Sequence, residues 1–69
     1  MKYLIVVEKG SQNYSAYVPD LPGCVATGKT RKVVEKNIRE AIALHLQGMQ
    51  EDGIPPNPPE AYAQYQEVV

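Results

Sequence analysis

Several residue types are scarce or absent in this chain of 69 residues. It contains one cysteine, one histidine, and no tryptophan or phenylalanine. A single cysteine cannot close a disulfide within the chain, and one cysteine with one histidine cannot supply the four ligands of a structural zinc site. A domain this small buries only about 60 % of the surface that its unfolded chain exposes. Self-association is therefore the remaining way to stabilise it.

Long apolar runs are also missing. The longest, Tyr3 to Val7, is far shorter than the roughly 20 residues of a transmembrane helix. No signal peptide is recognisable at the N-terminus, and a lone cysteine without an export signal predicts a cytoplasmic protein with no membrane partner. With 43 % hydrophobic and 22 % charged residues, the composition is typical of an ordinary globular domain.

The charges nearly balance but are unevenly distributed. The formal net charge is −1, which argues against a general nucleic-acid binder. Five of the seven basic residues nevertheless lie between positions 29 and 39, whereas residues 40–69 contain none. This basic cluster comprises Lys29, Arg31, Lys32, Lys36 and Arg39. A solvated helix face is the simpler interpretation, and contact with RNA or with an acidic protein surface is the alternative.

Three strands are predicted in the first half of the chain. Residues 3–8 are apolar on both alternating faces, which predicts a central strand covered on both sides. One helix can cover only one side, so we expect a second subunit on the other. Residues 14–18 complete an antiparallel hairpin that Pro19 terminates, and residues 24–28 form a third strand after a Pro22-Gly23 turn.

A long helix is predicted next. Apolar residues recur at intervals of three and four from Val34 to Met49, as one face of a helix requires. Thr30 is a suitable N-cap and Gly53 a suitable end, so we expect the helix to run from Arg31 to Asp52. Such a helix is longer than the strands, and its last turns should extend past the sheet.

The remaining residues complete a single domain, 1–69. The hairpin, third strand and helix occupy residues 1–54, and residues 55–59, which hold four of the six prolines, should form an extended strap. Residues 60–69 are expected to form a helical turn and then a short last strand over residues 66–69.

Four segments in this order resemble one known family, the HicB-like antitoxins of toxin–antitoxin systems. They are the apolar opening strand that ends in Glu8-Lys9, the Tyr-x-Ala-Tyr-Val strand from Tyr14 to Val18, the Pro-Asp-Leu-Pro-Gly-Cys run from Pro19 to Cys24, and Gly28-x-Thr30 before a helix that contains Asn37 to Ile42. The Pro-Asp-Leu-Pro-Gly-Cys run is the most specific of the four. The resemblance covers the N-terminal domain of that family.

The resemblance implies an α+β fold of β-β-β-α-β order. Its antiparallel sheet has three to four strands, carries one long helix on one face, and is partly similar to ribonuclease H. Relatives assemble as dimers or tetramers and bind a small mRNA-cleaving HicA toxin. Many also carry a DNA-binding domain after this one. Since the sequence stops at Val69, we do not expect direct DNA binding. Relatives commonly have acidic residues where the first helical turn here has Arg31 and Lys32.

Catalytic interpretations are weaker than structural ones. Cys24 is expected to be a small buried apolar residue rather than a nucleophile, because no base is placed beside it by the sequence. His45 lies at the edge of the apolar helix face without a second ligand at metal-binding spacing. The opening strand lacks the carboxylate that two-metal nuclease chemistry needs, and Glu8 follows its apolar run. No enzyme activity, cofactor or metal is expected.

The sequence therefore predicts a non-enzymatic antitoxin module that sequesters a HicA-like toxin and self-associates through its sheet as a homodimer or homotetramer. The alternative is an oligomeric or RNA-associated protein that functions without a toxin. The candidate partner-binding residues are Tyr14, Tyr17, Asp20, Lys29, Arg31 and Lys32.

Overall fold

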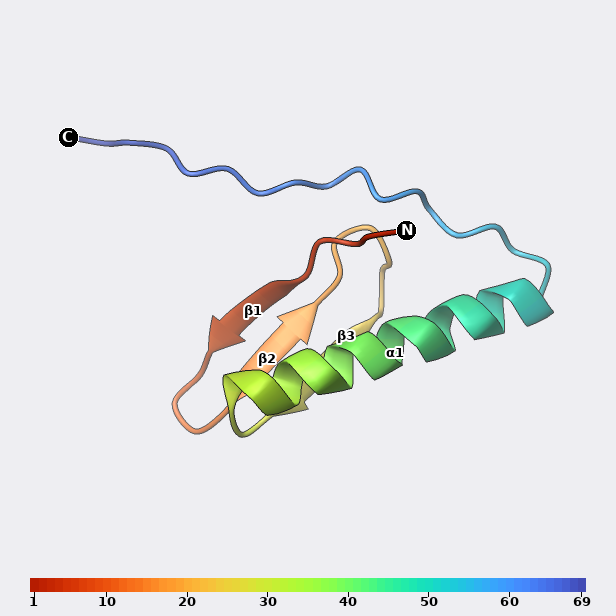
Figure 1. Cartoon of the computed structure of the whole chain (residues 1–69), viewed down its shortest axis with the longest axis horizontal. Helices are drawn as coiled ribbons and strands as arrows, with labels where there is room; N and C mark the ends of the chain where they lie inside the picture. Colours follow the sequence, from red (N-terminus) through yellow and green to blue (C-terminus); the bar gives the residue numbers. More distant parts are fainter.

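The computed structural model describes all 69 residues and contains three strands followed by one helix. Strands β1 (Val6–Lys9), β2 (Tyr14–Tyr17) and β3 (Val25–Gly28) form an antiparallel sheet in the order β1-β2-β3. Helix α1 (Arg31–Glu51) lies across one face of this sheet (Figure 1). The predicted α+β class is confirmed, with three strands in the sheet.

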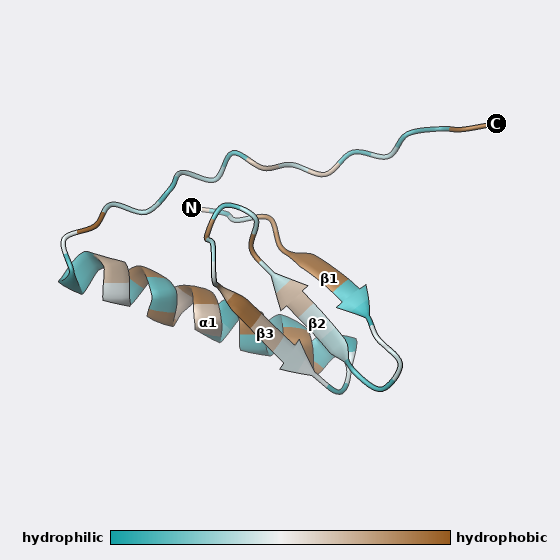
Figure 2. Ribbon diagram, turned by 180° about the vertical axis from the view of Figure 1, so that it is seen from behind, coloured by the Kyte–Doolittle hydropathy of each residue, from teal (hydrophilic) through white to brown (hydrophobic).

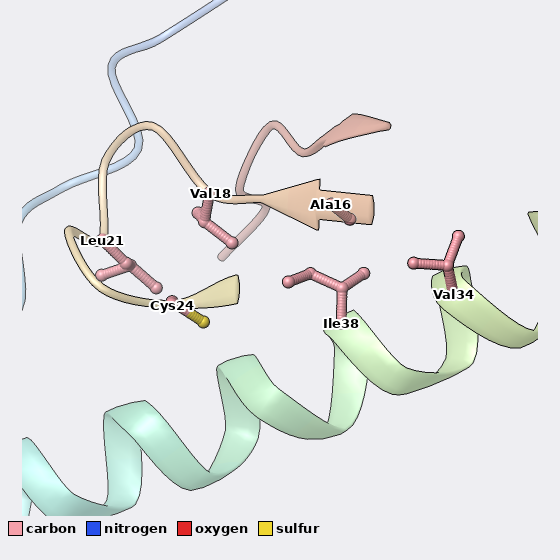
Figure 3. Close-up of a cluster of buried hydrophobic side chains, with 6 residues drawn as sticks. All are labelled: Ala16, Val18, Leu21, Cys24, Val34 and Ile38. Carbon is pink, nitrogen blue, oxygen red and sulfur yellow. The ribbon is translucent and has the colours of Figure 1, made fainter. Parts of the chain in front are cut away.

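A small hydrophobic core lies between the sheet and α1 (Figure 3). Val34 and Ile38 project from one face of the helix toward the sheet, one turn apart as the helical repeat requires. The turn between β2 and β3 folds Leu21 under the same layer. The six buried residues are Ala16, Val18, Leu21, Cys24, Val34 and Ile38.

The prediction that the first strand is central is wrong. β1 lies at an edge of the sheet and β2 is in the middle. The strand also begins at Val6 rather than Tyr3, because the register pairs Val6 with Tyr17 and would place Leu4 opposite Pro19. Proline has no N–H to donate to a ladder, so pairing stops there. Val18 already donates its N–H to the Cys24 carbonyl, at 3.2 Å, within the next turn.

The two ends of α1 are capped as predicted. Thr30 accepts a hydrogen bond through Oγ1 from the Val33 N–H at 3.1 Å. At the other end Gly53 has φ of 70°, and the Ile54 N–H donates to the Met49 carbonyl at 2.8 Å. This pair of features is a Schellman motif, which satisfies carbonyls that the helix leaves free. The last turns of α1 extend past the sheet (Figure 1), and α1 is not apolar enough to cross a membrane.

Residues 54–69 contain neither a helix nor a strand. The helical turn expected over residues 60–65 and the last strand expected over residues 66–69 are therefore absent. The chain instead turns back from the end of α1, passes the N-terminus and continues beyond the sheet (Figure 1). The Cα radius of gyration is 13.5 Å, against about 11 Å for a compact domain of this length. The last residues thus project from the folded body.

Candidate functional site

The face of the sheet opposite α1 is open to solvent (Figure 2). The strand register places Val6, Tyr17 and Val25 directly opposite one another, and paired residues share a face of the sheet. Tyr17 is 41 % exposed and Val25 is 64 % exposed. These three side chains form an apolar row across all three strands, which we call the open-face row. Cross-strand apolar rows of this kind are suited to covering by another protein surface.

A polar row lies beside the open-face row. Glu8, Ser15 and Thr27 pair across the three strands two residues further along, and all three are exposed. The open face therefore has an apolar part near the start of β1 and a polar part near the β1–β2 loop. A partner that covers this face would bury the first part and could hydrogen-bond at the second.

The basic end of the molecule is formed by the residues around the start of α1. Lys29, Arg31 and Lys32 are exposed there. Arg31 lies 4.0 Å from Glu35, an exposed pair of small energetic value. Lys29 and Lys32 form no ion pair in the structure. Positive charge beside a helix N-terminus is mildly unfavourable, so this end combines unneutralised charge with a terminus that favours anions.

Asp20 instead lies in the turn between β2 and β3 and holds the strap, which in the structure we extend to residues 55–61. Its Oδ2 accepts hydrogen bonds from the N–H groups of Glu60 at 3.0 Å and Ala61 at 2.9 Å. Asn57 donates through Nδ2 to the Asp20 carbonyl at 3.1 Å and accepts at its own carbonyl from the Tyr3 hydroxyl at 2.7 Å. The strap is thus fixed at the end of the sheet opposite the basic end.

The six predicted interface residues consequently occupy three separate places. Tyr14 pairs with Gly28, faces α1 and packs against the core, close to the basic end. Tyr17 faces the opposite way, in the open-face row. Asp20 lies at the strap. The structure does not gather these residues into one site, and their role in binding a partner stays a prediction.

Cys24 belongs to the hydrophobic core. Its side chain is 4 % exposed, and burial raises the pKa of the Cys24 thiol. The thiol therefore stays protonated at neutral pH, the state in which it is a poor nucleophile. His45 is half-buried on α1, and no group of three His, Cys, Asp or Glu side chains is placed to hold a metal ion.

Val6 and Val25 are functional candidates that the sequence analysis did not single out. The signal was present, because Val25 and Thr27 alternate with the core-facing residues Cys24 and Ala26 along the third strand. Strict alternation places Val25 on the face that α1 does not cover. Its partner Val6 then follows only from the register, which the sequence leaves open.

Residues 3–68 match the family model described as the HicB-like antitoxin of bacterial toxin–antitoxin systems. A 14.9 kDa protein from the rep-hol intergenic region of Haemophilus phage HP1 is 44 % identical over 52 residues, which cover 75 % of this chain and 39 % of the phage protein. A UPF0150 protein of Helicobacter pylori is 45 % identical over 68 % of this chain and 65 % of its own length. The chain thus spans less than two thirds of these two relatives.

A solved structure is also similar. A chain of the HicA3 and HicB3 toxin–antitoxin complex superposes with a TM-score of 0.73 and 35 % sequence identity. The match covers 86 % of this chain and 70 % of the other. The similarity therefore extends over most of the sheet and helix described above.

Proposed function

This chain belongs to the HicB-like antitoxin family, and we propose that it is an antitoxin module that binds and inhibits a small HicA-type toxin that cleaves mRNA. The single observation that carries the proposal is the match between this fold and a chain of a HicA3–HicB3 toxin–antitoxin complex. The toxin and its inhibition come to this chain from that similarity and from the motifs of its sequence.

The module acts by binding and not by catalysis. The only thiol is buried and protonated at neutral pH because burial raises the pKa of Cys24. The surface features of the molecule are instead suited to contact with proteins, namely an apolar row on the open face and unneutralised basic groups at the start of α1.

Self-association through the open face is the second part of the proposal. The open-face row would be buried when the open faces of two copies meet, which adds apolar burial to a domain that has six buried residues. Such a contact is isologous, since the same row serves both copies, and it closes as a dimer.

We assign toxin contact to the basic end, with Tyr14 beside Lys29, Arg31 and Lys32. The open face is then free for self-association, and the two surfaces lie apart. Charge at the basic end would speed encounter with a toxin surface that carries acidic residues, and this attraction weakens as salt rises.

The test is co-expression with the product of the small reading frame next to this gene. We expect the two chains to co-purify and the toxin's growth inhibition to be relieved. The Lys29→Ala/Lys32→Ala variant should weaken the complex at least tenfold, whereas the matched Lys36→Ala variant, farther along α1, should not. Failure of the unaltered chain both to co-purify and to relieve toxicity would overturn the proposal.

A companion measurement addresses self-association. Val25→Lys places a charge in the open-face row, whereas Thr27→Lys places the same charge on the same strand and face, in the polar row. We expect the first variant to weaken self-association at least tenfold and the second to leave it nearly unchanged. Equal effects of the two variants would contradict the assignment of the contact to the open-face row. RNA binding with a steep salt dependence would instead support the RNA-associated alternative.

A further inference from the structure

A hollow lies where the end of α1 meets the strap, and we call it the strap hollow. Its volume is about 470 Å³, which is within the range of about 300–1,000 Å³ that is typical of binding pockets. Its wall is mostly apolar and has one polar side chain, that of Gln50. The apolar lining residues are Met1, Leu46, Ile54, Pro55 and Pro56.

The strap hollow is held open from two sides. The Schellman motif at Gly53 fixes the direction in which the chain leaves α1 (Figure 1). A few residues further along, Asn57 is bound both to the Asp20 carbonyl and to the Tyr3 hydroxyl. A wall fixed in this way loses little conformational freedom when a partner binds, so less of the binding free energy is lost in ordering it.

The strap also presents a ridge beside the hollow. Its prolines fix φ and keep the residues before them extended, which favours polyproline II. With three residues per turn, Pro55 and Pro58 lie on the same side of such a segment, and both are exposed. Among residues 54–59 only the Asn57 carbonyl accepts a hydrogen bond. Exposed prolines with free carbonyls are the surface that aromatic side chains of other proteins recognise.

The charge around the hollow favours a cation. The last turn of α1 contains no basic residue, and Glu51 and Asp52 are exposed there. The C-terminal end of a helix carries a partial negative charge of its own. Residues 40–69 contain no lysine or arginine, so the Met1 α-amino group is the one cation that the lining residues bring. A partner with a positive charge is therefore complementary to this end of the molecule.

The lining also favours an aromatic ring over an aliphatic side chain. The Met1 thioether makes favourable contacts with aromatic rings, and proline rings pack against them. The Gln50 side-chain amide forms no hydrogen bond within the chain. Its oxygen can accept from an indole N–H, which is a donor only. Tryptophan thus satisfies both the apolar wall and its polar group.

We propose that the strap hollow and the Pro55–Pro58 ridge form a docking site for a segment of another protein in which a tryptophan lies next to a lysine or arginine. The indole fills the hollow, the basic group lies beside the end of α1, and N–H groups of the segment donate to the free strap carbonyls. This site is at the opposite end of the molecule from the basic end. It does not depend on the proposed toxin contact, and both sites can be occupied at once.

The test uses two short peptides as probes, acetyl-Trp-Lys-amide and acetyl-Trp-Glu-amide, in NMR titrations of the intact chain. The lysine peptide should bind at least about fivefold more tightly at low salt, and the difference should shrink as salt is added. The shift changes should centre on Leu46 and Ile54. Equal affinities, or shift changes centred elsewhere, would overturn the proposal.

Two further titrations distinguish the occupants. Tryptamine has the same ring and charge without the peptide groups, and it should bind more weakly than the lysine peptide. Equal binding of tryptamine would contradict the assignment to a protein segment. An affinity for the lysine peptide that falls as the chain concentration rises would mean that a second copy occupies the hollow, and would also overturn the proposal.

Matched variants locate the site. Gln50→Lys adds a positive charge to the lining, whereas Gln47→Lys adds the same charge one turn earlier on α1, and both glutamines are exposed. The first should weaken binding of the lysine peptide at least about fivefold, and the second should change it little. Ile54→Ala should weaken it as well, with Leu44→Ala as the control outside the hollow. Equal effects within either pair would overturn the proposal.

Discussion

Adjacent apolar residues on the two faces of the sheet differ sharply in burial. Cys24 is 4 % exposed beneath α1, whereas the next residue, Val25, is 64 % exposed on the open face. Both are apolar, and the strand alternation alone separates them. The comparison teaches that the chain uses one set of its apolar residues to fold and leaves another set of similar composition for contact with other chains.

The same division runs along the chain. Val34 and Ile38 on α1 are buried against the sheet, while Tyr62 and Tyr65 near the C-terminus are almost fully exposed. The hydrophobic effect makes exposure of the second pair unfavourable. We call the buried residues between the sheet and α1 the covered part of the molecule, and the exposed apolar residues of the open face and the C-terminus the uncovered part. Substitutions in the covered part should change folding, and those in the uncovered part should change only association.

The largest effect is expected at the centre of the core. Ile38→Ala removes a side chain that is 1 % exposed, and the cavity left beneath the sheet should lower the free energy of unfolding by about 2–5 kcal/mol. Leu44→Ala makes a similar truncation on the same helix, where Leu44 is 69 % exposed, and should cost less than about 1 kcal/mol. Urea denaturation at fixed protein concentration measures both. Equal losses would remove the distinction between the covered and uncovered sides of α1.

The next largest effect is expected from the same substitution, glycine to alanine, at two positions where it should change the free energy of unfolding in opposite directions. A Cβ at Gly28 would lie 2.6 Å from the main-chain nitrogen and 2.9 Å from the Cα of Val34, so the start of α1 would have to move. We expect Gly28→Ala to lower the free energy of unfolding by about 1–3 kcal/mol. A Cβ at Gly48 meets nothing within 4 Å, and Gly48→Ala should stabilise the helix by about 0.5–1 kcal/mol. Thermal unfolding followed by circular dichroism distinguishes the two signs.

Much of the covered part could be predicted because its signals are local. Thr30, Gly53 and the left-handed Gly23, with φ of 86°, each act within a few residues of their own position. The order of the strands could not be predicted in this way. An apolar pattern on both faces fits a covered central strand, and it equally fits an edge strand that has one face uncovered, which is the arrangement of β1.

The candidate site was predicted less well for a related reason. The six residues were chosen one by one from motifs and charge, but their grouping depends on register and on the path of the strap. Alternation could have shown that Tyr14 and Tyr17, three residues apart on one strand, face opposite ways. Nothing local to Asp20 shows that its carboxylate binds the N–H groups of Glu60 and Ala61, which are 40 and 41 residues away.

A smaller effect is expected at alkaline pH. Burial raises the pKa of Cys24 in the folded chain, whereas in the unfolded chain the thiol ionises near its ordinary value of about 8.5. Above that value the unfolded state binds fewer protons than the folded state, so the free energy of unfolding falls as pH rises. The loss is at most about 1.4 kcal/mol per pH unit. The decline should begin as pH rises through about 8.5 in the unaltered chain and be reduced in Cys24→Ala, and a parallel decline in both would contradict it.

The smallest change in the free energy of unfolding is expected at Asp20, which links the sheet to the C-terminal residues. Asp20→Ala removes the acceptor of two N–H groups in the strap, and we expect the amides of Glu60 and Ala61 to exchange hydrogen at least about tenfold faster. The free energy of unfolding should fall by less than about 1 kcal/mol, because these bonds lie near the surface. Asp52→Ala, at the exposed end of α1, is the control and should leave both amides protected.

The outcome at Asp20 also decides between two roles for this residue. If the amides of Glu60 and Ala61 lose protection, the role of Asp20 is to hold this part of the chain at the end of the sheet. If the amides stay protected while toxin binding weakens, Asp20 contacts the partner, as its place in the Pro-Asp-Leu-Pro-Gly-Cys run led us to expect. A loss of stability as large as that of Ile38→Ala would mean that the strap is part of the core, and the division between the two parts of the molecule would then be wrong.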